Sequence, residues 1–208
     1  MLIFFICLFF SIAIIFLVWR FASNYYSLPC PGWLSWMIER DNPFVKVHHA
    51  SQIIEHLNLH PGMLVLDAGC GPGRVTIPLA KSMNKNIEVV AMDIQASMLG
   101  RVIKKSKKEN LTNIQFLQVG LGKNTLEKNK FDRVILVTVI GEIPNQESAI
   151  KEIFKTLKPG GILSITETVF DPHYQSIKSI LQMTEKIGFH ERNRYGNFVA
   201  YTINLEKI

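Results

Sequence analysis

The stretch "VLDAGCGPGR", residues 65–74, combines a carboxylate with three closely spaced glycines directly behind an apolar run. Glycines let a ligand approach the backbone without obstruction by Cβ atoms, and they adopt positive φ angles easily. A second carboxylate, Asp93, ends the next apolar run and follows Gly73 by twenty residues. A carboxylate in that position can accept hydrogen bonds from both hydroxyls of a ribose. The spacing therefore predicts a ligand that contains a nucleoside.

A dinucleotide is one candidate for this ligand, and the loop disfavours it. Dinucleotide-binding loops read G-x-G-x-x-G, so that the pyrophosphate sits on the N-terminus of the following helix. Here the third glycine comes one position too early, and Arg74 follows it. Asp67, just before the loop, would repel a phosphate and suits a ligand that carries an ammonium group. An NAD-type or nucleotide-sugar oxidoreductase is therefore disfavoured.

Repeated strand–helix units must position these residues. Strand patterns alternate with helical patterns from residue 44 onward, and the continuously apolar run at 131–140 is typical of a central strand. This alternation predicts an α/β fold, with a parallel sheet, right-handed crossovers and helices on both faces. A closing hairpin around residues 195–197 adds antiparallel strands at one edge. We expect strands at 61–69, 87–93, 114–119, 131–140, 162–168 and in the hairpin 189–206, and helices at 44–59, 74–84, 96–110, 146–157 and 173–188.

Four motifs in this order carry a family resemblance. "VLDAGCGPGR", "VVAMD", "FDRVILVTVI" and "LKPGGILSITET" resemble the successive motifs of the class I S-adenosylmethionine-dependent methyltransferases, from about Leu57 to the C-terminus. "LKPGGIL" is similar to the small-molecule branch that includes the ubiquinone- and menaquinone-biosynthesis methyltransferases. The resemblance implies a doubly wound, mostly parallel, seven-stranded Rossmann-like sheet. It also implies S-adenosylmethionine as the cofactor and a small molecule as the methyl acceptor.

The resemblance further assigns roles to individual residues. Asp67 and the glycine-loop backbone hold the methionine portion of the cofactor, Asp93 takes the ribose hydroxyls, and Ile94 packs on the adenine. Thr138 lies beside the cofactor sulfur and the substrate entrance. The expected cofactor-binding residues are Asp67, Gly69, Cys70, Gly71, Gly73, Asp93, Ile94, Gly120, Leu121 and Thr138.

One position departs from the family pattern. The family commonly has an aspartate after the third strand, which accepts the adenine amino proton, and this chain has Gly120 there. A backbone carbonyl or Asn124 could substitute. Loss of one such hydrogen bond costs ~1 kcal/mol, which weakens cofactor binding without abolishing it.

The sulfonium cofactor implied by the resemblance brings an activated methyl group. The protein mainly has to hold the acceptor atom in line with that methyl in a site without water. A general base is needed where the attacking atom loses a proton. The loops after the fourth and fifth strands face the acceptor, and their titratable residues are either bases or ordinary solvated loop residues. The catalytic candidates are Glu142, His173 and Tyr174, with Glu167 and Asp171 beside them. Related quinone methyltransferases often have a histidine near positions 141–142, and its absence here disfavours a quinone acceptor.

An uncharged apolar run occupies residues 2–19, with Ser11 as its only clearly polar member. As a helix it would span ~27 Å, close to the hydrocarbon thickness of a bilayer. A cleaved signal peptide is the alternative, but no basic n-region or small-x-small cleavage site supports it. Arg20, Arg40 and Lys46 follow the run, so the positive-inside rule places the remainder in the cytoplasm. We expect a single-pass membrane protein with a transmembrane anchor at 1–22, a juxtamembrane linker or lid at 23–44 and a cytoplasmic methyltransferase domain at 45–208.

Two further segments allow two interpretations each. Trp33 and Trp36 recur at helical spacing, and they either lie at the bilayer interface or cap the domain core. The basic run at 101–108 is either a solvated helix face or a patch that contacts anionic lipid.

Composition excludes several classes of protein. The net charge of +6 is too mild to indicate nucleic acid by itself, and no nucleic-acid-binding motif accompanies it. Three cysteines without a CxxC pair predict neither a disulfide framework nor a zinc site, so we expect no metal. The expected partners are a small-molecule or lipid acceptor and the membrane. A membrane-tethered scaffold without catalytic activity is the second functional hypothesis, and affinity for S-adenosylmethionine separates the two.

Overall fold

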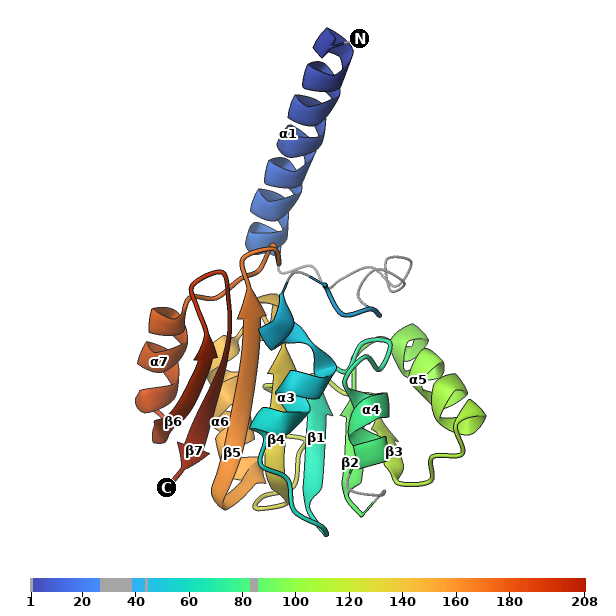
Figure 1. Ribbon diagram of the computed structural model, residues 1–208. Helices are drawn as coiled ribbons and strands as arrows, with labels where there is room; N and C mark the ends of the chain where they lie inside the picture. Colours follow the sequence, from blue (N-terminus) through green and yellow to red (C-terminus); the bar gives the residue numbers. More distant parts are fainter. Residues whose placement is uncertain (1, 27–38, 44, 83–85) are drawn as a thin grey trace.

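The computed structural model describes residues 2–26, 39–43, 45–82 and 86–208. In this part of the chain a seven-stranded sheet carries helices on both faces, and helix α1 (Leu2–Tyr26) projects from one end of it (Figure 1). The strands are β1 (Leu64–Ala68), β2 (Glu88–Met92), β3 (Ile114–Leu117), β4 (Phe131–Val137), β5 (Leu157–Thr168), β6 (Phe189–Gly196) and β7 (Ala200–Lys207). The other helices are α3 (Ala50–His56), α4 (Thr76–Lys81), α5 (Ala96–Lys108), α6 (Gln146–Thr156) and α7 (Ile177–Glu185), with 3-10 helices η2 (Lys46–His48) and η4 (Ile140–Glu142).

The strand order is β3-β2-β1-β4-β5-β7-β6. Strands β1 to β5 pair in parallel, and β7 is antiparallel to both of its neighbours. The winding reverses between β1 and β4, because β2 and β3 follow on one side and β5 on the other. Ligands of open α/β sheets bind at such a reversal, beyond the carboxyl ends of the strands. The predicted doubly wound sheet with antiparallel C-terminal strands is confirmed.

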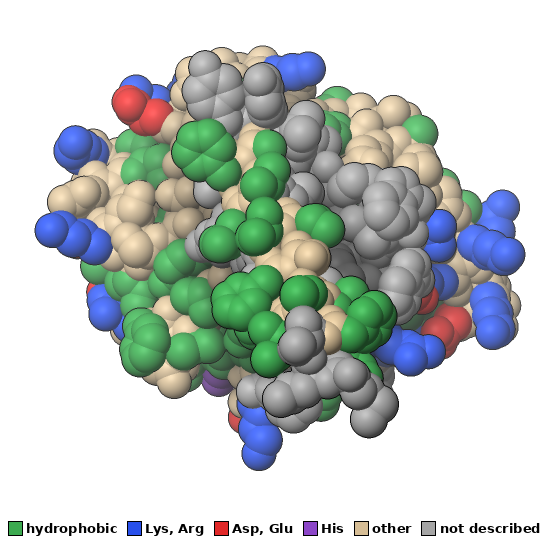
Figure 2. All heavy atoms as spheres, turned by 90° about the horizontal axis from the view of Figure 1, so that it is seen from above, with side chains coloured by type: hydrophobic (Ala, Val, Ile, Leu, Met, Phe, Trp, Pro, Cys, Tyr) green, Lys and Arg blue, Asp and Glu red, His purple; other side chains and the backbone are tan. Residues whose placement is uncertain are grey.

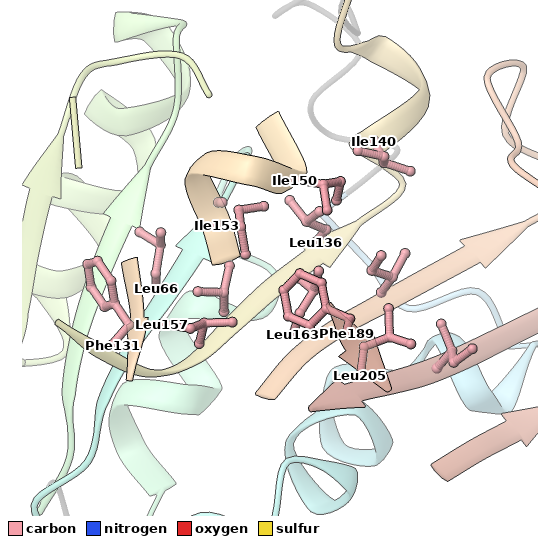
Figure 3. Close-up of a cluster of buried hydrophobic side chains, with 14 of the residues drawn as sticks. Leu66, Phe131, Leu136, Ile140, Ile150, Ile153, Leu157, Leu163, Phe189 and Leu205 are labelled. Atoms are coloured by element: carbon pink, nitrogen blue, oxygen red, sulfur yellow. The ribbon is translucent and has the colours of Figure 1, made fainter. Parts of the chain in front are cut away.

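Two layers of buried apolar side chains pack on the two faces of this sheet. On one face, Leu66 and Leu136 of the strands pack against Ile150 and Ile153 of α6 (Figure 3). On the other face, α3, α4 and α5 cover Ile135 and its neighbours. Strand β4 has fully buried side chains on both faces, as predicted for a central strand.

The helices are shorter than the hydrophobic pattern predicts. The helix expected at 44–59 is divided at His49, whose backbone is extended (ψ 139°). The helix expected at 173–188 begins at Ile177, because the Ser176 side chain accepts a hydrogen bond from the Ser179 amide and caps it there. Strand β4 ends at Val137, because Thr138 takes a positive φ angle of 54°. Side-chain periodicity does not show such local breaks.

Within the described residues, no helix is long and apolar enough to cross a membrane. The transmembrane helix predicted for residues 1–22 is therefore not supported by the structure. Trp33 and Trp36 lie outside the described residues, so both interpretations of them stay predictions.

Candidate functional site

The loop between β1 and α4 lies at the reversal of the sheet. Its glycines Gly69, Gly71 and Gly73 have φ angles of 75°, 51° and 86°, which residues with a Cβ rarely adopt. A Cβ at Gly69 would also lie 2.5 Å from Cγ2 of Val139, just beyond β4. The Gly69 amide donates to the Met92 carbonyl (2.8 Å), which fixes the loop to the end of β2. The loop thus offers bare backbone to a ligand, as the sequence predicts.

Asp67, near the end of β1, is buried beside this loop. One carboxylate oxygen accepts a hydrogen bond from the Thr76 hydroxyl at 2.6 Å. Burial raises the pKa of Asp67 from 3.8 to about 6, against the lowering effect of Thr76. A cationic ligand group next to this carboxylate would offset the cost of burying its ionised form. Sequence reasoning missed Thr76, whose one available indication was a hydroxyl side chain in the first turn after the loop.

Asp93 follows β2 and faces the same loop. Its Oδ2 accepts a hydrogen bond from the Gly71 amide (2.9 Å), and its Oδ1 accepts one from the Gln95 amide (2.8 Å). Strands β1 and β2 pair in parallel, so Asp67 and Asp93 lie at the same edge of the sheet. Burial raises the pKa of Asp93, and the charge of Asp93 also raises the pKa of Asp67. Each carboxylate oxygen has a further lone pair for a hydroxyl donor. The structure therefore brings together Asp67, Asp93 and the glycine loop.

Gly120 and Ile94 lie against each other at the next position along the sheet edge. A Cβ at Gly120 would be 3.0 Å from Cγ2 of Ile94, whose side chain is 55% exposed. This exposed side chain leaves an apolar surface on which a flat ring could pack. Asn124, one of the two expected substitutes for the missing aspartate, accepts a hydrogen bond from Lys155 with its side-chain oxygen (3.3 Å). Leu121 packs half-buried against the core.

Glu152 of α6 holds the loop that carries Gly120. It is 2% exposed, and its two oxygens accept four hydrogen bonds from backbone amides of the loop. The donors are Gly122 (2.6 Å), Lys123 (3.1 Å), Thr125 (2.6 Å) and Leu126 (3.1 Å). One buried carboxylate thus orders a connection in which no helix lies between β3 and β4. Sequence reasoning missed Glu152, which resembles any other glutamate on a helix.

The segment before the domain is clamped onto the glycine loop. Arg74 donates to the Asp41 carboxylate and to the His48 carbonyl, each at 2.6 Å. Lys105 pairs with Glu39 (2.7 Å) and donates to the Pro72 carbonyl (2.7 Å). The described end of the predicted linker or lid therefore contacts the cofactor loop. One lysine of the basic run is part of this clamp, which neither interpretation of the run foresaw.

The loops after β4 and β5 meet at the other end of the site. The Thr138 amide donates to the Thr166 carbonyl (2.9 Å), and its hydroxyl donates to the Val137 carbonyl (2.7 Å). Gly141 lies so close to the His173 backbone that a Cβ would collide with it. The structure thus joins Thr138, Glu142 and the loop after β5 in one region.

The catalytic candidates in this region already have structural partners. Tyr174 donates its hydroxyl hydrogen to the Phe198 carbonyl (3.1 Å). His173 is 3% exposed, and its ring lies 3.7 Å from the Asp171 carboxylate. Glu167 is 1% exposed and accepts a hydrogen bond from the Gln175 amide. Burial, followed by the charge of Asp171, raises the pKa of Glu167 well above its usual value. These contacts favour structural roles for Glu167, His173 and Tyr174 in this region.

The described residues include no group of three or more His, Cys, Asp or Glu placed to hold a metal ion. The chemistry that this arrangement supports is binding of a cationic nucleoside ligand along the strand ends.

Comparison with known proteins agrees with this geometry. A methyltransferase-domain family model matches residues 59–199. The demethylmenaquinone methyltransferase of Lactococcus lactis subsp. lactis is 36% identical over 107 residues, 51% of this chain and 42% of that protein. The Staphylococcus saprophyticus enzyme of the same name is 30% identical over 161 residues, 74% of this chain and 68% of that protein. The matches thus span between 42% and 68% of these relatives' length.

Solved structures show the same fold. A SAM-dependent methyltransferase from Aquifex aeolicus aligns with a TM-score of 0.75 at 19% identity, covering 86% of this chain and 100% of that one. The family model covers well over half of the chain, and the glycine loop, Asp67 and Asp93 lie within it. The chain therefore belongs to the S-adenosylmethionine-dependent methyltransferases, related to enzymes of quinone biosynthesis.

Proposed function

We propose that this protein transfers the methyl group of S-adenosylmethionine to a small, hydrophobic or lipid-like acceptor at a membrane. The observation that carries the proposal is the meeting of Asp67, Asp93 and the positive-φ glycine loop at the reversal of the sheet. The relatives named for demethylmenaquinone support an apolar acceptor, although this chain lacks a histidine at positions 141–142.

In this proposal the residues have separate tasks. Asp67 binds the cofactor ammonium, Asp93 binds the ribose hydroxyls, and Ile94 covers the adenine. S-adenosylmethionine would supply an activated methyl group, and Thr138 lies where an acceptor would be held in line with it. Positioning and exclusion of water then supply most of the rate enhancement, because the methyl group is already activated.

Binding of the cofactor tests the enzyme hypothesis against the scaffold hypothesis. We expect isothermal titration calorimetry to detect binding of S-adenosylmethionine and of its demethylated product to the protein. Asp93→Asn should weaken binding by ~1.5–3 kcal/mol, because it removes a charged acceptor of hydrogen bonds. Glu88→Gln is the matched control, since Glu88 is exposed at the start of β2, the strand that Asp93 follows. Equal affinity of both variants would mean that the ribose lies elsewhere, and absence of binding would favour the scaffold.

The identity of the acceptor requires a chemical search. We expect membrane lipids from a deletion strain to contain a species that lacks one methyl group. Mass spectrometry detects that loss, and the purified protein should restore the methyl group in vitro. If the species that the purified protein methylates is instead found in the water-soluble fraction, the lipid-like acceptor is refuted.

Membrane attachment through residues 1–22, with a cytoplasmic catalytic domain, is also part of the proposal. Along α1, Phe9, Ile15 and Phe21 are each more than 65% exposed, and contact with lipid would remove these side chains from water. Attachment would raise the effective concentration of a membrane-bound acceptor. We expect the full chain to stay with membranes after alkaline extraction and a chain lacking residues 1–22 to be released. A mature N-terminus beyond Ala22 would contradict this anchor.

A further inference from the structure

Two phenylalanines are exposed near the loops after β4 and β5, where the proposed function places the acceptor. We call these two loops the acceptor end of the site. Phe170, after β5, is 57% exposed, and Phe198, between β6 and β7, is 78% exposed. Single exposed apolar side chains are common on protein surfaces, so exposure alone indicates no partner. The setting of this pair carries the inference.

Hydrogen bonds tie the two loops into one unit. The Val169 amide donates to the Val199 carbonyl (2.9 Å), and the Tyr174 hydroxyl donates to the Phe198 carbonyl (3.1 Å). The Thr168 hydroxyl also donates to the Val199 carbonyl (3.3 Å). We call residues 168–174 and 197–199 the aromatic platform. Because three hydrogen bonds join the two loops, the two phenylalanines lie on an ordered frame.

The platform borders the acceptor end and lies at the same end of the sheet as α1. It contains His173, whose backbone contacts Gly141 in the loop after β4. Figure 1 shows that the loop after β5 and the β6–β7 turn lie at the end from which α1 projects. Figure 2 looks at that end along α1, whose apolar side chains project toward the viewer, and mainly Lys and Arg side chains lie along the rim of this view.

We propose that Phe170 and Phe198 insert into the headgroup–acyl boundary of an anionic bilayer, so that the acceptor end of the site opens at the membrane surface. This inference rests on the proposed function, because it gives a lipid-like acceptor a path into the site. Transfer of the exposed rings from water into the bilayer is favourable, and the basic rim is attracted to anionic headgroups. The exposed apolar side chains of α1 at the same end of the sheet favour a bilayer over an acidic protein surface as the partner.

The opposite end of the sheet supplies an internal control. Ile208 is 80% exposed, similar to Phe198, but it follows β7 at the far end of the sheet (Figure 1). A non-specific attraction of exposed apolar side chains to lipid would affect both positions. Insertion of the platform affects positions 198 and 170 but not position 208.

Site-specific fluorescence in the full chain tests this difference. Cys7 and Cys30 are changed to serine, Cys70 is buried, and a nitrobenzoxadiazole probe is attached after Phe198→Cys, Phe170→Cys or Ile208→Cys. The labelled proteins are mixed with vesicles of phosphatidylcholine and phosphatidylserine that carry nitroxide-labelled acyl chains. We expect quenching at positions 198 and 170 to be at least threefold stronger than at 208. Removal of phosphatidylserine should reduce the difference.

Two other outcomes would refute insertion of Phe170 and Phe198 into the bilayer. Equal quenching at 198, 170 and 208 in protein that sediments with the vesicles means that α1 alone contacts the lipid. Protein that does not sediment means that neither α1 nor the platform binds a bilayer. Calorimetry of the same labelled proteins with S-adenosylmethionine reports on the enzyme independently and shows that each variant is folded. Loss of cofactor binding by unlabelled protein would instead refute the proposed function.

Discussion

Replacement of Glu152 by glutamine tests whether one buried carboxylate maintains the adenine side of the site. The substitution preserves the shape of the side chain but replaces one acceptor oxygen with an NH2 group. Each oxygen of Glu152 now accepts two backbone hydrogen bonds. In Glu152→Gln, two of the four loop amides would therefore face a donor.

The expected loss of stability follows from those two amides. A buried donor without an acceptor costs about 1–3 kcal/mol. The loop amides are partly buried, so water can satisfy them in part, and we expect a total of about 2–4 kcal/mol. In a protein of this size each kcal/mol lowers the Tm by about 2–4 °C. The Tm of the variant should therefore fall by about 4–16 °C.

Cofactor binding should weaken in the same variant, because the loosened loop begins at Gly120. We expect a loss of about 0.5–1 kcal/mol, or roughly two- to fivefold in Kd. Thermal unfolding with and without S-adenosylmethionine measures both effects, together with calorimetric titration. Glu147→Gln is the matched control on the same helix, since Glu147 is exposed and pairs with Lys151. This control should leave both the Tm and the Kd unchanged.

Two results would refute this reasoning. If Glu152→Gln unfolds at the same temperature as Glu147→Gln, the four amides do not depend on the carboxylate. If stability falls but cofactor affinity is unchanged, Glu152 supports the fold without ordering the adenine side.

Three further predictions concern the glycine loop. The pKa of Asp67 rises from 3.8 to about 6 on folding, so the apo protein should lose stability as the pH rises between these values, and cofactor affinity should increase as the pH rises through about 6. Melting curves and titrations near pH 5 and pH 7 should show both trends, and Asp67→Asn should remove them. Gly71→Val should nearly abolish cofactor binding measured by calorimetry, because its φ of 51° and the ligand space both exclude a branched side chain; retained binding would contradict the loop assignment. Arg74→Met should break the contacts with Asp41 and His48 and speed limited proteolysis near residues 41–48, and an unchanged cleavage rate would show that other contacts hold the segment.

The sequence alone predicts the fold class and the cofactor side of the site. Strand and helix periodicities are local, so the alternation from residue 44 onward predicts the parallel sheet. Asp67 and Asp93 each come at the end of a strand pattern, and parallel strands place such ends at one edge. Local residue patterns therefore suffice to place the glycine loop and both carboxylates.

The tertiary structure decided the contacts that stabilise this site. Glu152 binds amides 26–30 positions before it in the chain, and Arg74 reaches Asp41 across 33 positions. Hydrogen-bond partners at such separations leave no periodic pattern in the sequence, because they depend on how whole elements pack. The close approach of Gly141 to His173 and the hydrogen-bonded frame beneath Phe170 and Phe198 have the same origin. Local spacing thus determined which ligand the chain can hold, and packing between distant segments determined how firmly the site is built around it.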